Sequence, residues 1–242
     1  MEIAVYGDSF GDSHHSFKSL TNEQKQKLSF VKDSWVEILA KKYSVTNYCK
    51  YSSSFEWSVN NFVKTHTNYD KIIMLVTSPD RITMGNPHNK QPTPHMVDYK
   101  NSVLWKERAK KEGWNKHLDA VLDYYIYVYN EELVDLKHKA LLEYVKQLRP
   151  DTILIPCFDH SFEHPGANLN DVYQFENRHM NIQTPILKRD IRKCHLTNEN
   201  NAILAKIVER SIHGEDFFMD LNDFCIPKDS KEKYLHKDLP YE

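Results

Sequence analysis

The sequence predicts an α/β protein in which a parallel sheet lies between layers of helices. Short apolar runs at residues 2–6, 43–48, 71–77 and 152–156 have the length of strands, and segments with helical spacing of apolar residues separate them. The third run is apolar throughout, which is typical of a strand buried on both faces of a sheet. Strands that alternate with helices favour right-handed crossovers and therefore parallel pairing. A chain of 242 residues is long enough for one large domain spanning 1–242, and a second domain is not required.

The charge balance gives no sign of a nucleic-acid-binding protein. Lys and Arg number 32 and Asp and Glu number 34, so the formal net charge is -2. Without a global basic field, nucleic acid is not expected as a partner. Hydrophobic residues make up 40% of the chain and charged residues 27%, as in folded globular proteins. No apolar run approaches the length of a membrane span, so a membrane partner is not expected either. The sequence does not indicate an oligomeric state.

The cysteines indicate a reducing compartment. Cys49, Cys157, Cys194 and Cys225 are widely spread and form no Cys-x-x-Cys pair, so neither a zinc site nor a disulfide framework is expected. The first predicted strand begins at residue 2, and cleavage of a signal peptide would remove it. We therefore expect no signal peptide and a cytoplasmic location.

A Gly-Asp-Ser turn directly follows the first predicted strand. Open α/β sheets place their functional sites at the carboxyl ends of strands, so Ser9 is the candidate nucleophile. The tripeptide is also ordinary turn chemistry, because Gly permits positive φ and Asp and Ser bond their own backbone. A second copy at residues 11–13 lies outside the strand and is interpreted as loop. Asp12 and His14 could also open a metallophosphoesterase site, but the later Gly-Asn-His cluster that such a site needs is missing from the sequence.

Local signals mark the starts of two helices. Thr21 and Gln24 have the spacing of a capping box, and Ser54 can cap a helix after the second strand. After Thr21 we expect one helix whose apolar face covers the sheet. The apolar residues of that face are Leu28, Val31, Trp35, Ile38 and Leu39.

The alternation of strands and helices breaks down between residues 82 and 130. An irregular stretch of this length is typical of a lid or binding loop, and a partly helical surface insertion fits it equally. From Tyr124 to Leu148 the apolar spacing is helical without a breaker, so we expect one long helix there. The tyrosines at its start are expected to be packed rather than functional. Residues 159–181 are expected to form a polar loop.

The last part of the chain places a histidine before a final helix. His195 precedes Thr197 and Asn198, which are good caps for that helix. The Gly-Asp-Ser turn and this histidine block together resemble the SGNH, or GDSL, hydrolase superfamily. The resemblance implies a three-layer, flavodoxin-like sandwich in which Ser9 attacks an ester carbonyl and His195 is its base. It covers the strand order, the first block and the last block, but not residues 82–130.

The acid of that family is missing from its usual place. Three residues before the histidine the chain has Arg192 instead of Asp. Asp190, five residues before it, is the nearest carboxylate and is expected to orient His195 and to stabilise the imidazolium. A Ser–His dyad, with a backbone carbonyl that orients the ring, is the alternative.

The oxyanion hole departs further from the family, whose second and third blocks have no literal counterparts here. We expect the backbone N–H groups of Ser9 and Ser53 to bind the oxyanion. A further donor could come from Ser78, Arg81 or Thr77 after the third strand, or from Asn60 or Asn61. Asp8, next to the nucleophile, completes the candidate substrate-binding set. The family's Asn amide has no equivalent, and losing one such donor costs about 3–4 kcal/mol of transition-state binding.

These observations predict a serine esterase that acts on a small O-acyl ester, such as an acetylated sugar, through an acyl-serine intermediate. No cofactor and no metal are expected. The alternative from another class is a catalytically silent scaffold of the same fold used for binding or assembly, because the second and third blocks are degenerate. A metallophosphoesterase with metal at Asp12 and His14 is the remaining alternative.

Overall fold

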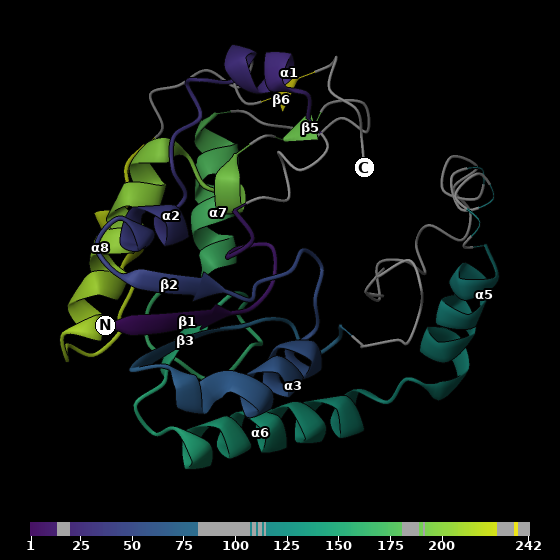
Figure 1. Ribbon diagram of the computed structural model, residues 1–242. Helices are drawn as coiled ribbons and strands as arrows, with labels where there is room; N and C mark the ends of the chain where they lie inside the picture. Colours follow the sequence, from purple (N-terminus) through teal and green to yellow (C-terminus); the bar gives the residue numbers. More distant parts are fainter. Residues whose placement is uncertain are drawn as a thin grey trace.

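The computed structural model confirms the α/β class. Its central sheet has four parallel strands in the order β2-β1-β3-β4, the strand order with which flavodoxin-like sheets begin (Figure 1). The structure describes residues 1–13, 20–81, 107, 110, 113, 115–180, 189–190, 192–226 and 235–236.

The four strands lie where the sequence predicts them. β1 (Glu2–Tyr6) pairs with β2 (Ser44–Asn47) on one side and with β3 (Lys71–Val76) on the other, and β4 (Ile153–Pro156) is the outer neighbour of β3. The last five residues of β3 are fully buried, as a strand covered on both faces should be. Because all pairs are parallel, the loops after β1, β3 and β4 emerge at one edge of the sheet.

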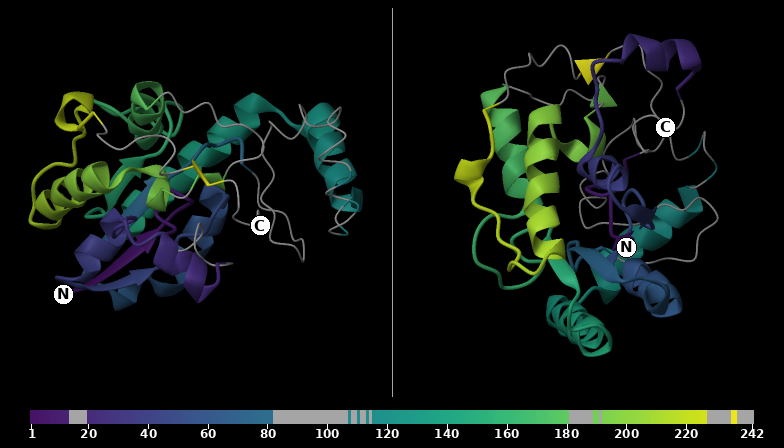
Figure 2. Two further views of the ribbon diagram at one scale, coloured as in Figure 1. Left: turned by 90° about the horizontal axis from the view of Figure 1, so that it is seen from above. Right: turned by 60° about the vertical axis from the view of Figure 1, so that its left-hand side comes forward.

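A layer of helices packs on each face of the sheet (Figure 2). The first face contacts α2 (Trp35–Ala40), α7 (Leu169–His179) and α8 (Asn198–Ile212), and the second contacts α3 (Phe55–Thr65) and α6 (Glu131–Leu148). Alternate strand residues face the two layers, since successive side chains point to opposite faces. Those of the first core are Ile3, Val5, Ile73, Leu75, Ile153 and Ile155, and those of the second are Ala4, Tyr6, Ile72, Met74 and Val76.

The expectation of a single helix after Thr21 is wrong, because the segment forms two helices. Thr21 and Gln24 form the predicted capping box, but α1 (Asn22–Lys27) ends after six residues. The chain then leaves helical geometry until Ser34, whose own capping box with Glu37 starts α2. The first N–H groups of a helix have no partner within the helix, and a capping side chain accepts hydrogen bonds from them. The capping box at Ser34 therefore starts a second helix within the apolar pattern. The predicted cap at Ser54 is confirmed at the start of α3.

The long helix expected from Tyr124 is also interrupted. α5 (Asn115–Asp123) continues into the π-helical turn η5 (Tyr124–Val128), and Tyr129 is extended. Asn130 then accepts the Leu133 N–H as the cap of α6. In Figures 1 and 2, α5 stands away from the sheet. The rest of the expected insertion, apart from residues 107, 110 and 113, lies outside the described residues.

Two further features complete the fold. α7 occupies part of the segment expected as a polar loop, and its capping box, Asn168 with Asp171, was a readable signal. A short antiparallel pair joins β5 (Arg189–Asp190) to β6 (Leu235–His236).

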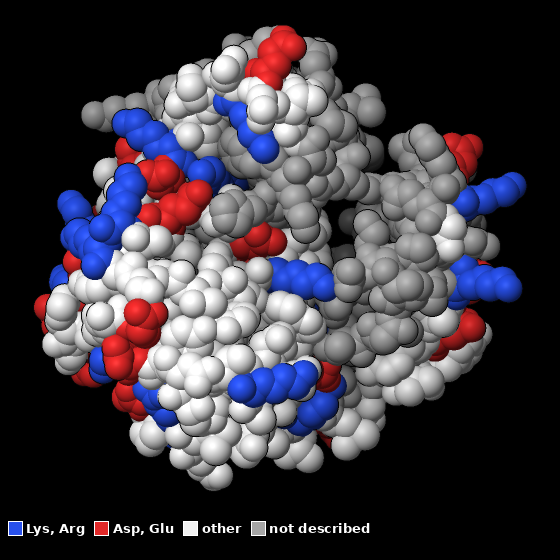
Figure 3. All heavy atoms as spheres, in the orientation of Figure 1, with Lys and Arg blue, Asp and Glu red and all other residues white. Residues whose placement is uncertain are grey.

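Among the described residues, no helix has both the length and the apolar composition that crossing a membrane requires. The four cysteines are free thiols. Figure 3 shows acidic and basic side chains interspersed over one face of the molecule.

Candidate active site

Ser9 lies just beyond β1, at the carboxyl edge of the sheet. β2, the next strand in the chain, lies on one side of β1, and β3, the strand after it, lies on the other side. Such a reversal of strand order is where open α/β sheets form their ligand crevices. Ser9 is 7% exposed, and neither its N–H nor its hydroxyl is hydrogen-bonded to another residue of the described ranges. Both groups are therefore available to a ligand.

The turn that carries Ser9 is fixed from inside the protein. A side chain at Gly7 would place its Cβ only 2.5 Å from Leu75 Cβ on the neighbouring strand, so the turn needs glycine there. The fully buried Asp8 carboxylate accepts hydrogen bonds from the Phe10 N–H at 3.0 Å and the Thr77 hydroxyl at 2.8 Å. The expectation that Asp8 contacts substrate is wrong, because its side chain has no access to solvent and instead holds the turn.

Arg81 is the cationic partner of Asp8. Its Nη1 donates to Asp8 Oδ2 at 2.7 Å and to the Ser53 carbonyl at 3.3 Å, while the guanidinium lies over the ring of Phe158 at 5.3 Å. The side chain is 14% exposed. Its Nε and Nη2 have no hydrogen-bond acceptor within the described part of the chain. Arg81 thus lies against the nucleophile turn with one nitrogen anchored and two unused.

Ser53 does not supply the expected oxyanion donor. Its N–H donates to the Lys50 carbonyl at 3.0 Å, and its hydroxyl donates to the Gly7 carbonyl at 2.8 Å. Both donors therefore bind the protein's own backbone, and the residue is completely buried. Ser53 links the loop after β2 to the nucleophile turn instead of facing a ligand.

The structure brings His195 to the same edge of the sheet. The His195 ring lies edge-on to Phe10, the residue after Ser9, with ring centroids 5.2 Å apart, and edge-on to Tyr173 at 5.6 Å. Cys194 and His195 both adopt left-handed backbone, with φ of 51° and 63°. Two consecutive non-glycine residues in this region are strained, and such strain persists only where the surroundings impose it.

Glu176 is the main group that holds the left-handed turn at Cys194 and His195 in place. This carboxylate in α7 is fully buried and accepts from Arg192 Nη1 at 2.8 Å and from both the N–H and the hydroxyl of Thr197. Asn200 Nδ2 donates to it as well, at 2.7 Å. Burial raises the pKa of Glu176, and the Arg192 guanidinium opposes that rise. The chain is thus held on both sides of His195 by one side chain.

α7 and α8 complete the cradle around the histidine turn. Tyr173 is one turn before Glu176 on α7 and also stacks on the Arg192 guanidinium at 4.9 Å. From α8, Asn201 Nδ2 donates to the carbonyls of Lys193 and Leu196. Arg192, three residues before His195, is therefore a buried structural cation. No local pattern in the sequence predicts this arrangement, because the residues that form it are not neighbours in the chain.

Asp190 is the residue that is expected to orient His195. The backbone of Asp190 lies in β5, opposite Leu235, but the position of its side chain is outside what the structure describes. The buried cysteines near the site are not alternative nucleophiles, because burial raises the thiol pKa of Cys49, Cys157 and Cys194 well above its usual value.

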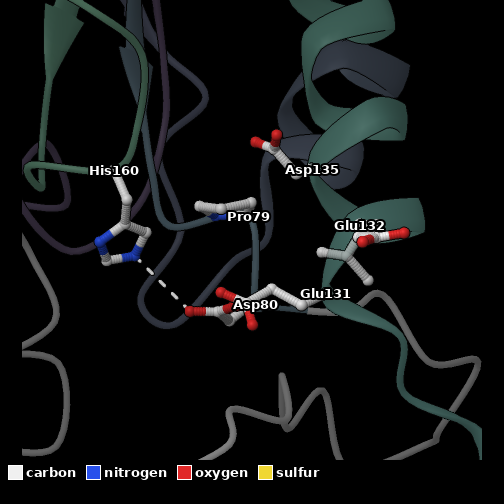
Figure 4. Close-up of a pocket in the computed structure, with 7 residues that line it drawn as sticks. Pro79, Asp80, Glu131, Glu132, Asp135 and His160 are labelled. Carbon is white, nitrogen blue, oxygen red and sulfur yellow. Dashed lines mark ion pairs between the residues drawn. The ribbon is translucent and has the colours of Figure 1, made fainter.

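A second serine–histidine pair lies beside this site. Ser78 Oγ, after β3, and His160 Nε2, after β4, are hydrogen-bonded at 2.8 Å. Asp80 Oδ2 approaches the same nitrogen at 3.6 Å and accepts from Ser78 at 3.2 Å (Figure 4). In a relay the acid binds the other ring nitrogen, so this arrangement is not a catalytic triad. Ser78, expected as an oxyanion donor, bonds to Asp80 and His160, and no contact within the described ranges joins it to Ser9.

The Asp80 carboxylate forms one wall of a pocket of about 540 Å³. Figure 4 shows His160 on the opposite side from α6, whose acidic side chains line the remaining wall. Tyr129 donates to Asp80 Oδ1 and Tyr125 to its carbonyl. Burial, together with the Asp80 charge, raises the pKa of both tyrosines, which therefore stay neutral donors. Tyr124, Tyr125 and Tyr129 are half-buried, as the expected packing requires, whereas Tyr127 is 79% exposed and contradicts it.

The metal site of the phosphoesterase alternative finds no support in the described ranges. Asp12 Oδ2 accepts the Tyr51 N–H at 3.0 Å, and no group of three or more His, Cys, Asp and Glu side chains there has the arrangement of a metal site. His14 lies outside the described residues. Comparison with known proteins adds nothing further, since no family model matches the chain and no curated protein matches it significantly.

Proposed function

We propose that this protein is a serine ester hydrolase of the SGNH type, with Ser9 as nucleophile and His195 as base. The observation that carries the proposal is the contact between Phe10 and His195, which brings the strained histidine turn against the nucleophile turn. Two loops that are far apart in the sequence supply the two residue types that acyl transfer needs, at the edge of the sheet where such sites form.

The reaction divides into two acyl transfers. Ser9 Oγ attacks the ester carbonyl while His195 takes the hydroxyl proton, and the tetrahedral intermediate collapses as the same histidine protonates the departing alcohol. Water then attacks the acyl-serine, with His195 again as base, and releases the carboxylic acid. Asp190 is proposed to orient the ring, and a dyad held by the rigid turn is the alternative.

The oxyanion is proposed to bind the Ser9 N–H and the unused nitrogens of Arg81. A guanidinium is a charged donor, and it can replace an amide that elsewhere contributes about 3–4 kcal/mol to transition-state binding. This assignment replaces Ser53, whose donors are used inside the fold. The proposed substrates are small O-acyl esters, with acetylated carbohydrates as the first class to test.

A catalytically silent scaffold is the second candidate. The observation in its favour is that both donors of Ser53 and the charge of Arg192 are committed to the protein's own structure. Such a protein would keep the fold and use the same edge of the sheet to bind a ligand without turning it over.

Hydrolysis of a short-chain aryl ester separates the two candidates. The Ser9→Ala variant should lose at least about 100-fold in kcat, because the nucleophile is removed. The Ser13→Ala variant, from the second Gly-Asp-Ser copy, is the matched control and should keep most of the activity. Equal losses in both variants would contradict the assignment of Ser9, and no turnover by the folded wild-type protein would favour the silent scaffold.

A further inference from the structure

A tight turn after β3 leads directly to Arg81. The Arg81 N–H closes this turn by donating to the Ser78 carbonyl at 3.3 Å, and the Asp80 N–H donates to Ser78 Oγ, also at 3.3 Å. Pro79 occupies the second position of the turn, which its fixed φ favours. Asp80 is the residue before Arg81, so the way in which Asp80 is held sets the direction in which the Arg81 side chain starts.

Two tyrosines hold Asp80 from outside this turn. Tyr125 donates its hydroxyl to the Asp80 carbonyl at 2.7 Å, and Tyr129 donates to the carboxylate at Oδ1. The Asp80 carbonyl and the Arg81 N–H belong to one planar peptide unit. The N–H of this peptide is bonded within the turn and its carbonyl is bonded to Tyr125, so both of its polar groups are fixed.

The two tyrosines belong to an unusual stretch of backbone. η5 is π-helical, and the Tyr129 N–H closes it by donating to the Tyr124 carbonyl at 2.8 Å. Such turns are rare and occur frequently at functional sites. Residues 126, 127 and 128 of this turn are apolar or aromatic and are 42%, 79% and 66% exposed, so burial of apolar surface does not explain it. What the turn achieves is that the hydroxyls of Tyr125 and Tyr129 both reach Asp80.

The Arg81 side chain links this turn to the nucleophile. Its Nη1 is anchored on Asp8, whose carboxylate also accepts the Phe10 N–H directly after Ser9. An arginine side chain carries about 2 kcal/mol of rotamer entropy, and a donor stabilises an oxyanion best when it is oriented before the reaction. Arg81 is therefore held at the guanidinium by Asp8 and at the backbone by the turn that the tyrosines fix.

We propose that Tyr125 and Tyr129 are positioning residues that hold Arg81, through Asp80, in the orientation that binds the oxyanion. The proposal rests on the proposed function, since it needs Arg81 as an oxyanion donor. It extends the role of the two tyrosines beyond the packing that the sequence predicts. Their effect on the reaction passes through residues 80 and 81, because their hydroxyls bond to Asp80.

Removal of each hydroxyl tests the proposal. Tyr125→Phe and Tyr129→Phe keep the ring and should each lower kcat about 3- to 10-fold, the factor that one ordinary hydrogen bond gives. KM for the short-chain aryl ester should stay within about two-fold, because the oxyanion exists only in the transition state. An unchanged kcat in both variants would overturn the proposal.

Tyr124→Phe is the matched control. The Tyr124 ring packs against Tyr125 with centroids 5.2 Å apart, but its hydroxyl has no hydrogen bond in the part of the chain that the structure describes. This variant should therefore keep the wild-type kcat. A loss in Tyr124→Phe equal to that in Tyr125→Phe would show that ring packing matters and that the bonds to Asp80 do not.

A double-mutant cycle tests whether the effect passes through Arg81. In an Arg81→Lys background, Tyr125→Phe should lower kcat by less than about two-fold, because the guanidinium that Tyr125 positions is already gone. A loss by the same factor in both backgrounds would overturn the positioning role, since Tyr125 would then act independently of Arg81.

Nitrogen-15 relaxation of the Arg81 Nε–H gives a readout that does not depend on turnover. Its signal is assigned by its loss in Arg81→Lys. The order parameter should fall from that of an ordered group to below about 0.6 in Tyr125→Phe and should stay at the wild-type value in Tyr124→Phe. A folded wild-type protein that hydrolyses no ester would overturn the proposed function and this proposal with it. An active enzyme whose Arg81 signal and kcat do not respond to Tyr125→Phe would overturn the positioning role alone.

Discussion

Glu176 and Arg192 form a completely buried ion pair, with 2.8 Å between Oε2 and Nη1, beside the backbone turn that presents His195. Thr197, on the other side of the histidine, donates two hydrogen bonds to the same carboxylate. Arg192, three residues before the histidine, is thus a buried cation that is neutralised from α7. The ion pair therefore holds the backbone on one side of His195.

Removing this carboxylate should destabilise the protein and disorder the histidine turn. Glu176→Ala leaves the buried Arg192 guanidinium without its carboxylate, and removing one charge of a buried ion pair typically costs about 3–5 kcal/mol. Denaturant unfolding should show that loss, and kcat should fall with it. Glu176→Gln in combination with Arg192→Met is the control, because it removes both charges and should be more stable than Glu176→Ala. A Glu176→Ala variant with wild-type stability would show that the pair does not hold the turn.

A second prediction concerns pH and a buried histidine in α6. His138 is 4% exposed, its Nε2 donates to the Ser161 carbonyl at 2.6 Å, and burial lowers its pKa. The ring is therefore neutral in the folded protein, while the unfolded chain binds a proton below about pH 6.5. Stability should be fully present above that pH and should fall below it, by at most about 1.4 kcal/mol per pH unit for this proton.

The measurement is urea unfolding of wild-type protein and His138→Gln at about pH 7.5 and about pH 5.5. The variant should lose less stability between the two values, because it lacks this titrating group. An equal loss in both proteins would mean that His138 does not contribute to the pH dependence.

Arg81 is predicted to act on turnover more than on substrate affinity. Its unused nitrogens are proposed to bind the oxyanion, which exists only in the transition state, so its removal should lower kcat with little change in KM. Arg81→Ala also leaves the buried Asp8 without its cation, so Arg81→Lys is the better variant. Lysine retains the charge beside Asp8 but lacks the planar fork.

We expect kcat of Arg81→Lys to fall about 10- to 100-fold, with unfolding free energy close to the wild-type value. A variant with unchanged kcat would show that the oxyanion is bound elsewhere.

The Ser78–His160 pair should not be the catalytic centre. Asp80 approaches the ring nitrogen that also bonds to Ser78, so it cannot orient the ring from the opposite side. His160→Gln should therefore keep most of the ester hydrolysis, whereas His195→Gln should reduce kcat by at least about 100-fold. The opposite ranking would move the active site to the pocket beside α6.

The strands could be predicted because their signals are local. β3 is apolar throughout, and β1 ends at a Gly-Asp-Ser turn, so both were placed within about a residue. Ser54 and Thr21 were readable as caps for the same reason. The split between α1 and α2 could not be predicted from apolar spacing, because that spacing continues through the second capping signal at Ser34.

The environment of His195 could be predicted only in part. Thr197 occupies the expected N-cap position of α8, although its hydroxyl donates to Glu176 instead of capping the helix. The left-handed backbone of His195 has no sequence signal, because no glycine marks it. Glu176 and Arg192 are 16 residues apart on different elements, so only the folded chain pairs them. The Ser53 donors were misjudged because their acceptors, the Lys50 and Gly7 carbonyls, depend on how two loops meet.

Covalent labelling of Ser9 tests the central claim most directly. A fluorophosphonate reacts with a serine hydroxyl only when a base activates it, forming a Ser–O–P bond with loss of fluoride. Intact-mass analysis and peptide mapping should find one adduct, on Ser9, and labelling should be lost in Ser9→Ala and strongly slowed in His195→Gln. An adduct on Ser78, or a folded wild-type protein that takes up no label, would contradict the assignment of Ser9 and His195 as the nucleophile and its base.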